Sequence, residues 1–85
     1  MKTIHYDVKT ALGLSMYPLV ELSSIASKYE SSICGFTGEF RADIKSLLSV
    51  VALEVMPGDL FTIVIDGADE EDAKTSIENF LKNLK

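Results

Sequence analysis

Residues 60–66, LFTIVID, constrain the fold of this chain more than any other stretch of its sequence. Six of the seven side chains are apolar or β-branched, which is typical of a β-strand that is covered on both faces. Such a strand would be a liability at the edge of a sheet, where unpaired backbone groups promote aggregation. The sequence therefore predicts that the strand at 60–66 is internal, with a neighbouring strand on each side.

The first thirty residues contain one strand pattern and one helix pattern. Residues 3–9 alternate between apolar and polar side chains, which predicts a strand with His5 on its polar, solvated face. Residues 16–29 carry apolar side chains at every third or fourth position, which predicts a helix with Ser15 at its N-cap. The expected core positions of this helix are Leu19, Leu22, Ile25 or Ala26, and Tyr29.

Two short strands, at about 32–36 and 39–43, are expected to form a hairpin around Thr37-Gly38. The single cysteine, Cys34, lies in the first of them and excludes an internal disulfide. We interpret it as a small packed residue and not as a nucleophile, because the sequence places no histidine or cationic cluster beside it.

The second half of the chain predicts two helices on either side of the internal strand. Residues 45–53 form a short helix that Ser46 can cap, and MPGD at 56–59 is a turn. The last helix opens on the acidic run that begins at Asp69 and ends near Lys82, a charge order that matches the helix dipole. The acidic run lacks the ligand spacing of a calcium loop, so we interpret it as a helix start.

The expected order is therefore β-α-β-β-α-β-α. This order predicts an α+β fold, an open-faced sandwich with a four-stranded antiparallel sheet and three helices on one face. With 85 residues, the chain is expected to be a single domain spanning 1–85.

Composition narrows the possible functions. Eight basic and thirteen acidic residues give a net charge of −5, which argues against direct binding of nucleic acid or anionic membranes. No apolar run approaches the length of a membrane span, and the N-terminus does not resemble a signal peptide, so we expect a cytoplasmic protein. The sequence has no paired base and nucleophile, no metal-binding cluster and no phosphate-binding glycine loop. We therefore expect no enzymatic activity, no metal and no cofactor.

Three stretches resemble HPr, the histidine-containing phosphocarrier family of the bacterial sugar phosphotransferase system. TIVIDGADE (62–70) is similar to the family's last strand and helix start, and ASKYESSI (26–33) to the end of its first helix. IKSLLSVVALEV (44–55) resembles its regulatory-serine segment. The likeness covers the whole chain, although the hairpin glycine, Gly38, comes one residue early. It implies the same α+β fold that the element order predicts.

The resemblance also identifies a changed phosphocarrier motif. In the family this motif runs Gly-Ile/Leu-His-Ala-Arg-Pro, whereas residues 13–18 of this chain read GLSMYP. Ser15 therefore stands where the phosphohistidine belongs, Met16 where the alanine belongs and Tyr17 where the arginine belongs. A serine hydroxyl without an activating base is a weak nucleophile, and tyrosine cannot supply a guanidinium for phosphate. We expect this degenerate site not to relay phosphate.

The resemblance implies a different role for Ser46. In the family, this serine is the target of HPr kinase/phosphorylase, and its phosphorylated form is a corepressor for a LacI-type catabolite control regulator. A phosphate at a helix N-terminus would meet free amides and the positive end of the dipole. The partner-binding residues expected beside it are Lys45, Leu47, Leu48 and Val51.

Two interpretations remain open. In the first, the chain is a regulatory HPr-like protein that is switched at Ser46. In the second, it is an HPr-fold interaction module that has lost both phosphorylation roles and presents Met16 and Tyr17 to another protein. On the residues alone, Ser46 could equally be only an N-cap, with some of the leucines around it in the core.

Overall fold

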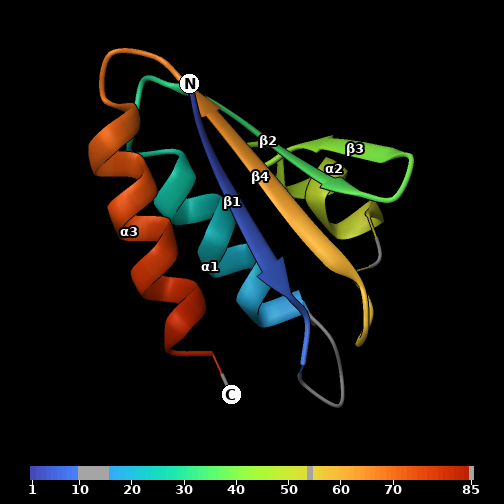
Figure 1. Ribbon diagram of the computed structural model, residues 1–85. Helices are drawn as coiled ribbons and strands as arrows, with labels where there is room; N and C mark the ends of the chain where they lie inside the picture. The colour runs from blue at the N-terminus through green and yellow to red at the C-terminus, as the bar shows by residue number, and fades with distance from the viewer. Residues whose placement is uncertain (10–15, 54, 85) are drawn as a thin grey trace.

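The computed structural model describes residues 1–9, 16–53 and 55–84. Its elements confirm the predicted order β-α-β-β-α-β-α (Figure 1). They are β1 (Lys2–Asp7), α1 (Met16–Ala26), β2 (Ser32–Thr37), β3 (Phe40–Asp43), α2 (Leu47–Ala52), β4 (Leu60–Asp66) and α3 (Glu70–Lys82). No helix in this described part of the chain is long and apolar enough to cross a membrane.

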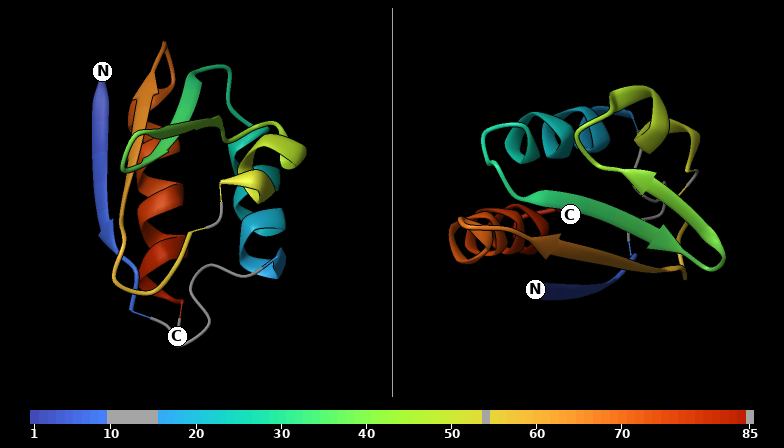
Figure 2. Two further views of the ribbon diagram at one scale, coloured as in Figure 1. Left: turned by 90° about the vertical axis from the view of Figure 1, so that its right-hand side faces the viewer. Right: turned by 90° about the horizontal axis from the view of Figure 1, so that it is seen from above.

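The four strands form one antiparallel sheet in the order β1-β4-β2-β3. The prediction for 60–66 is confirmed, because β4 lies between β1 and β2. The three helices cover one face of the sheet and leave the other face open, as Figure 2 shows. The predicted α+β open-faced sandwich is therefore confirmed.

The core lies between the sheet and the helices. Side chains alternate along β4, so that Phe61, Ile63 and Ile65 are fully buried under the helices while Thr62 and Val64 are half-buried on the open face. The helices contribute Leu22 from α1, Val50 from α2 and Ile77 from α3, all with no exposed surface. On α1 the expected stripe is confirmed at Leu19, Leu22 and Ala26, whereas Ile25 and Tyr29 are only partly buried.

Two predicted boundaries were wrong by a few residues. Helix α1 ends at Ala26 instead of reaching 29, because the amides of Lys28 and Tyr29 donate to carbonyls three residues back and tighten the last turn. The hairpin turn consists of Gly38 and Glu39, since Thr37 pairs with Phe40 across the strands. Gly38 has φ of 57°, a left-handed conformation that glycine adopts at no steric cost.

The start of α2 depends on a close contact at Gly35. A β-carbon built at Gly35 would lie 2.5 Å from Cδ1 of Ile44 and 2.8 Å from Cε1 of Phe61, two fully buried side chains. The absence of a side chain at Gly35 therefore gives Ile44 its place in the core. Since Ile44 lies two residues before Ser46, this packing also fixes where α2 begins.

The acidic residue at the start of α3 has a role that the sequence did not reveal. Asp69 stands at the N-cap, but its carboxylate makes no capping hydrogen bond to its own helix. It accepts hydrogen bonds from the backbone amides of Glu30 (2.8 Å) and Ser31 (2.9 Å) and from the Ser31 hydroxyl. The bond from the Ser31 hydroxyl, followed by that from the Glu30 amide, lowers the pKa of Asp69 below its ordinary value. Asp69 thus joins α3 to the segment between α1 and β2.

Candidate functional site

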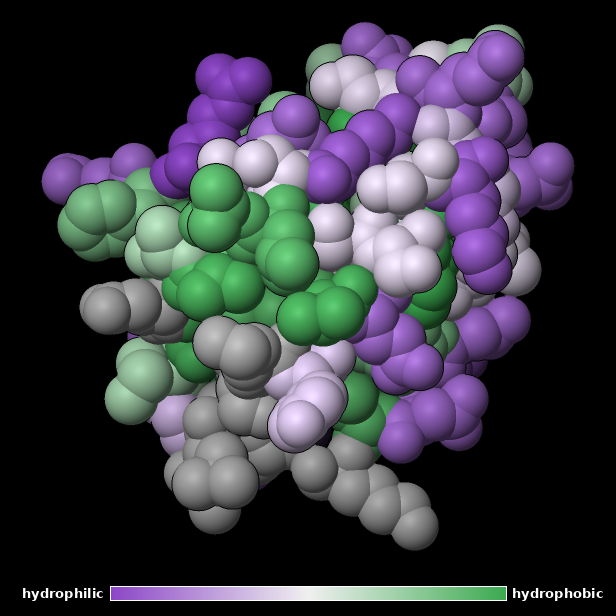
Figure 3. Space-filling model, turned by 180° about the vertical axis from the view of Figure 1, so that it is seen from behind, coloured by the Kyte–Doolittle hydropathy of each residue, from purple (hydrophilic) through white to green (hydrophobic). Residues whose placement is uncertain are grey.

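Helices α1 and α2 are neighbours, and together they carry the most exposed apolar side chains of the helical face. Tyr17 and Val20 on α1 are 87% and 40% exposed, and Leu47 and Leu48 on α2 are 42% and 86% exposed. Figure 3 shows hydrophobic side chains gathered over this part of the molecule. We call these four residues the α1–α2 surface. Large apolar side chains that gather on one face, instead of lying scattered, are typical of an interaction site.

Ser46 stands at the N-cap of α2, as the sequence predicted. Its backbone is extended, with φ of −95° and ψ of 108°, and its carbonyl accepts the first helical hydrogen bond from the amide of Val50 at 3.0 Å. However, its side chain makes no capping hydrogen bond. The expected cap is therefore present in the backbone only, and the half-buried hydroxyl is not committed to the amides of α2.

Lys45 is held away from the role that its sequence position suggested. Its ammonium group donates to the backbone carbonyl of Tyr29 at 2.6 Å, and its amide donates to Oδ1 of Asp43 at 3.0 Å. The side chain is half-buried. Lys45 thus links the segment before α2 to the segment after α1, and its charge lies on a carbonyl oxygen.

The other residues of the regulatory segment separate into surface and core. Leu47 and Leu48 belong to the α1–α2 surface, whereas Val51 is partly buried and packs against the core. Ser49 is exposed in the first turn of α2. The structure thus keeps the two leucines as candidate contacts and assigns Val51 mainly to packing.

The degenerate phosphocarrier segment is described only from Met16 onward. Ser15 lies outside the described residues, and α1 begins at Met16. The Tyr17 ring is exposed and, together with Pro18 and Val20, lines a shallow depression of about 480 Å³. Sequence reasoning missed Val20, and the available signal was its spacing, three residues after Tyr17 and outside the core stripe of α1.

The open face of the sheet contains the remaining reactive side chains. His5 is exposed there, and its Nδ1 lies 3.3 Å from Oγ1 of Thr62, in keeping with the solvated histidine that the sequence predicted. Cys34 differs from its prediction, because it is half-buried on the open face and not packed in the core. Its sulfur accepts a weak contact from the Arg41 guanidinium at 3.7 Å. The described residues contain no group of three or more His, Cys, Asp or Glu side chains placed to hold a metal ion.

Comparison with known proteins gives one consistent result. Residues 2–83 match the family described as "PTS HPr component phosphorylation site". The chain is 32% identical over 84 residues to the phosphocarrier protein HPr of Lysinibacillus sphaericus, covering 99% of this chain and 96% of that protein.

Solved structures agree with the sequence matches. The histidine-containing phosphocarrier protein of Mycoplasma superposes with a TM-score of 0.90 at 28% identity, covering 93% of this chain and 90% of that one. The catabolite repression containing protein Crh of Bacillus subtilis superposes with a TM-score of 0.74 over 100% of this chain and 98% of that one. At 20% identity, the likeness to Crh supports the fold alone.

Proposed function

The chain belongs to the HPr family of the bacterial phosphotransferase system, and we propose that it is a regulatory member, switched by phosphorylation of Ser46 in carbon catabolite control. The family consists of phosphocarriers, so a member of it would ordinarily carry phosphate on a histidine. This chain has a single histidine, His5, which lies on β1 and not at the position that the family motif assigns to the carrier. The proposal therefore separates a lost carrier role from a retained regulatory role.

The carrier role is lost for a chemical reason. Phosphohistidine passes its phosphoryl group on readily, because its P–N bond is labile and imidazole is a good leaving group. A phosphoserine ester at position 15 would be inert without a phosphatase, and the Ser15 hydroxyl has no base in its segment to activate it. Tyr17 offers no guanidinium to pair with the phosphate. His5 does not replace the carrier, because it lies on the open face of the sheet beside Thr62.

The regulatory role rests chiefly on the position of Ser46. Its hydroxyl makes no capping bond and stands immediately before two exposed leucines, Leu47 and Leu48. A phosphate of about −1.5 to −2 charge there would place a dianion at the border of the α1–α2 surface. An apolar surface with a charge at its edge suits a partner that offers apolar side chains and a basic group.

The partners that the family implies are HPr kinase/phosphorylase, which would add the phosphate, and a LacI-type catabolite control regulator, which would bind the product. The expected contacts of the regulator are Leu47, Leu48 and Tyr17. Lys45 would take part only if its ammonium left the carbonyl of Tyr29, to which it donates. Val51 would act through packing.

Mass spectrometry after treatment with an HPr kinase tests this proposal. We expect one phosphate per chain, localised to Ser46, in the wild type and in the Ser49→Ala variant. Ser46→Ala should remain unmodified, and an ordinary HPr should be included to show that the kinase is active. If wild type and Ser46→Ala are both unmodified by that active kinase, the regulatory proposal fails.

The second candidate function is an interaction module without phosphorylation. The observation in its favour is the exposed Tyr17 ring, which lies next to Val20 at a position where the family carries a phosphate-binding arginine. On this alternative a partner would bind the unmodified chain, and Tyr17→Ala would abolish binding while Ser46→Ala would not.

A further inference from the structure

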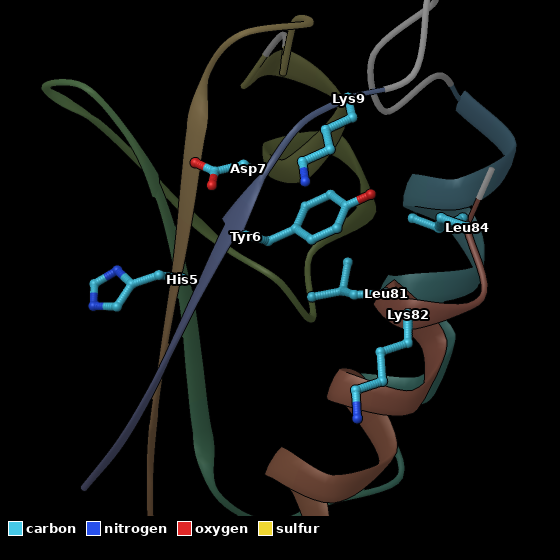
Figure 4. Close-up of a pocket in the computed structure, with 7 residues that line it drawn as sticks. All are labelled: His5, Tyr6, Asp7, Lys9, Leu81, Lys82 and Leu84. Carbon is cyan, nitrogen blue, oxygen red and sulfur yellow. The ribbon is translucent and has the colours of Figure 1, made fainter.

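A groove lies between β1 and the C-terminal half of α3, away from α1 and α2. Two adjoining depressions of about 380 and 180 Å³ share His5, Tyr6, Leu81 and Lys82 as lining residues. Figure 4 shows Tyr6, Lys9, Leu81, Lys82 and Leu84 between the strand and the helix, whereas His5 and Asp7 point to the other side of β1. We call the first five of these residues the β1–α3 groove. Its floor is apolar, and two ammonium groups border it.

These two cations stand out because the chain carries few basic residues and uses most of them internally. Lys2 pairs with Glu71, Lys74 with Glu78, Lys45 with the carbonyl of Tyr29, and Arg41 contacts Cys34. Among the described residues, only Lys9, Lys28 and Lys82 make no such contact. Two of these three line the same groove. The groove is thus a basic site in a protein of net charge −5.

The wall of the groove on the β1 side is a free sheet edge. Strand β1 pairs with β4 alone, and the views in Figure 2 show no other described segment along its outer side. The amide and carbonyl of Val8 both bond toward the 58–59 segment before β4. Because backbone groups alternate in direction along an antiparallel strand, Thr3, His5 and Asp7 direct theirs outward. These residues can accept a further strand.

We propose that the β1–α3 groove binds an extended, acidic segment of a partner protein. The segment adds a strand to β1, and its alternate apolar side chains enter the groove against Tyr6 and Leu81. Its carboxylates lie beside Lys9 and Lys82. This is the mode in which backbone hydrogen bonds to a sheet edge supply affinity, while pockets for alternate side chains supply specificity.

The charges favour an acidic peptide over the other candidates for this edge. A second copy of the chain would bring its own β1, KTIHYD, which carries only one carboxylate. The overall negative charge opposes an acidic ligand at long range, but at physiological salt this repulsion is screened beyond about 8 Å. Contacts inside the groove are shorter than that, so the two lysines decide the preference. This site does not depend on the phosphorylation of Ser46.

The probe for the test is an eight-residue peptide in which valine and threonine alternate and two glutamates stand at one end. It is acetylated and amidated, and it is made with the glutamates at either end, so that both strand directions are covered. Binding to the full chain is followed by amide chemical shifts. We expect saturable shifts at Thr3, His5 and Asp7 and in the C-terminal half of α3. A peptide with glutamines in place of the glutamates should bind about tenfold more weakly.

Variants of the protein separate the two parts of the site. Lys9→Gln and Lys82→Gln should each weaken binding about threefold, whereas Lys28→Gln, with the same loss of charge outside the groove, should not change it. His5→Pro removes an outward amide and should weaken binding about tenfold, while His5→Ala keeps that amide and should bind normally. If His5→Pro does not fold, the same test is made with a probe N-methylated at alternate amides.

Three outcomes would overturn the proposal. One is the absence of saturable shifts with either probe at millimolar concentration. Another is equal binding of the glutamate and glutamine peptides, which would show that the lysines do not select an acidic ligand. The third is a set of shifts centred on α1 and α2, or a doubling of molecular mass without peptide, which would assign the edge to a second copy.

Discussion

Replacing Gly35 with alanine tests whether close packing at this position sets the start of α2. The added methyl group would lie 2.5 Å from Cδ1 of Ile44 and 2.8 Å from Cε1 of Phe61. Neither neighbour has exposed surface, so both would have to shift within a packed core. Overpacking of this kind costs about 1–3 kcal/mol, and the lower entropy of alanine in the unfolded chain offsets roughly 0.5 kcal/mol. We expect Gly35→Ala to lower the free energy of unfolding by about 2 kcal/mol.

A second substitution makes this prediction specific. Ile44→Val removes the nearest clashing atom and alone should cost about 1 kcal/mol. In the Gly35→Ala background it should cost much less, which gives a favourable coupling of about 1 kcal/mol in a double-mutant cycle. Urea denaturation followed by far-ultraviolet circular dichroism measures all four proteins, which suits a chain without tryptophan. A change below about 0.5 kcal/mol for Gly35→Ala, or strictly additive effects, would refute the packing argument.

Three further predictions concern the carrier site and two polar links. Incubation with enzyme I and phosphoenolpyruvate should leave the chain unlabelled; Ser15→His should recover little transfer and the double variant with Tyr17→Arg more, whereas labelling of the wild type would contradict the lost carrier role. Asp69→Asn should lower stability at neutral pH, because a lowered pKa in the folded state contributes stability that is present above the ordinary value of 3.8 and is lost as the pH falls through the folded pKa. Its stability should therefore depend less on acid pH than that of the wild type, as urea midpoints between pH 2 and 7 would show, and an unchanged pH profile would argue against the link to Ser31. Lys45→Met should lower the free energy of unfolding by about 1 kcal/mol through loss of one ammonium hydrogen bond, and thermal melts that match the wild type would show that this bond contributes nothing.

Local patterns in the sequence were sufficient for the order of elements and for the position of β4. The apolar content of 60–66 on both faces leaves no stable place for this strand except inside the sheet, and the structure confirms that place. The stripe of α1 likewise follows from helical spacing, with Leu19, Leu22 and Ala26 in the core. Such features depend on neighbours in the sequence, which periodicity can detect.

Contacts between distant segments could not be predicted in this way. Lys45 bonds to a carbonyl 16 residues earlier, and Asp69 bonds to Ser31, 38 residues earlier. Both were interpreted through their immediate neighbours, as a charge beside Ser46 and as a helix cap. The N-cap position of Ser46 was predictable from its local pattern, but the absence of its capping bond depends on side-chain geometry. Val20 was missed because one exposed valine has no signal until α2 lies beside α1.

The central claim is that phosphate on Ser46 controls binding through the α1–α2 surface. The most direct test is the affinity of a purified LacI-type catabolite regulator for the chain carrying phosphoserine at position 46, incorporated during synthesis so that no kinase is needed. We predict that this form binds at least about tenfold more tightly than the unmodified chain, and that Leu48→Ala removes most of the gain. Equal affinity for the two forms, or a gain that Leu48→Ala leaves intact, would contradict the account.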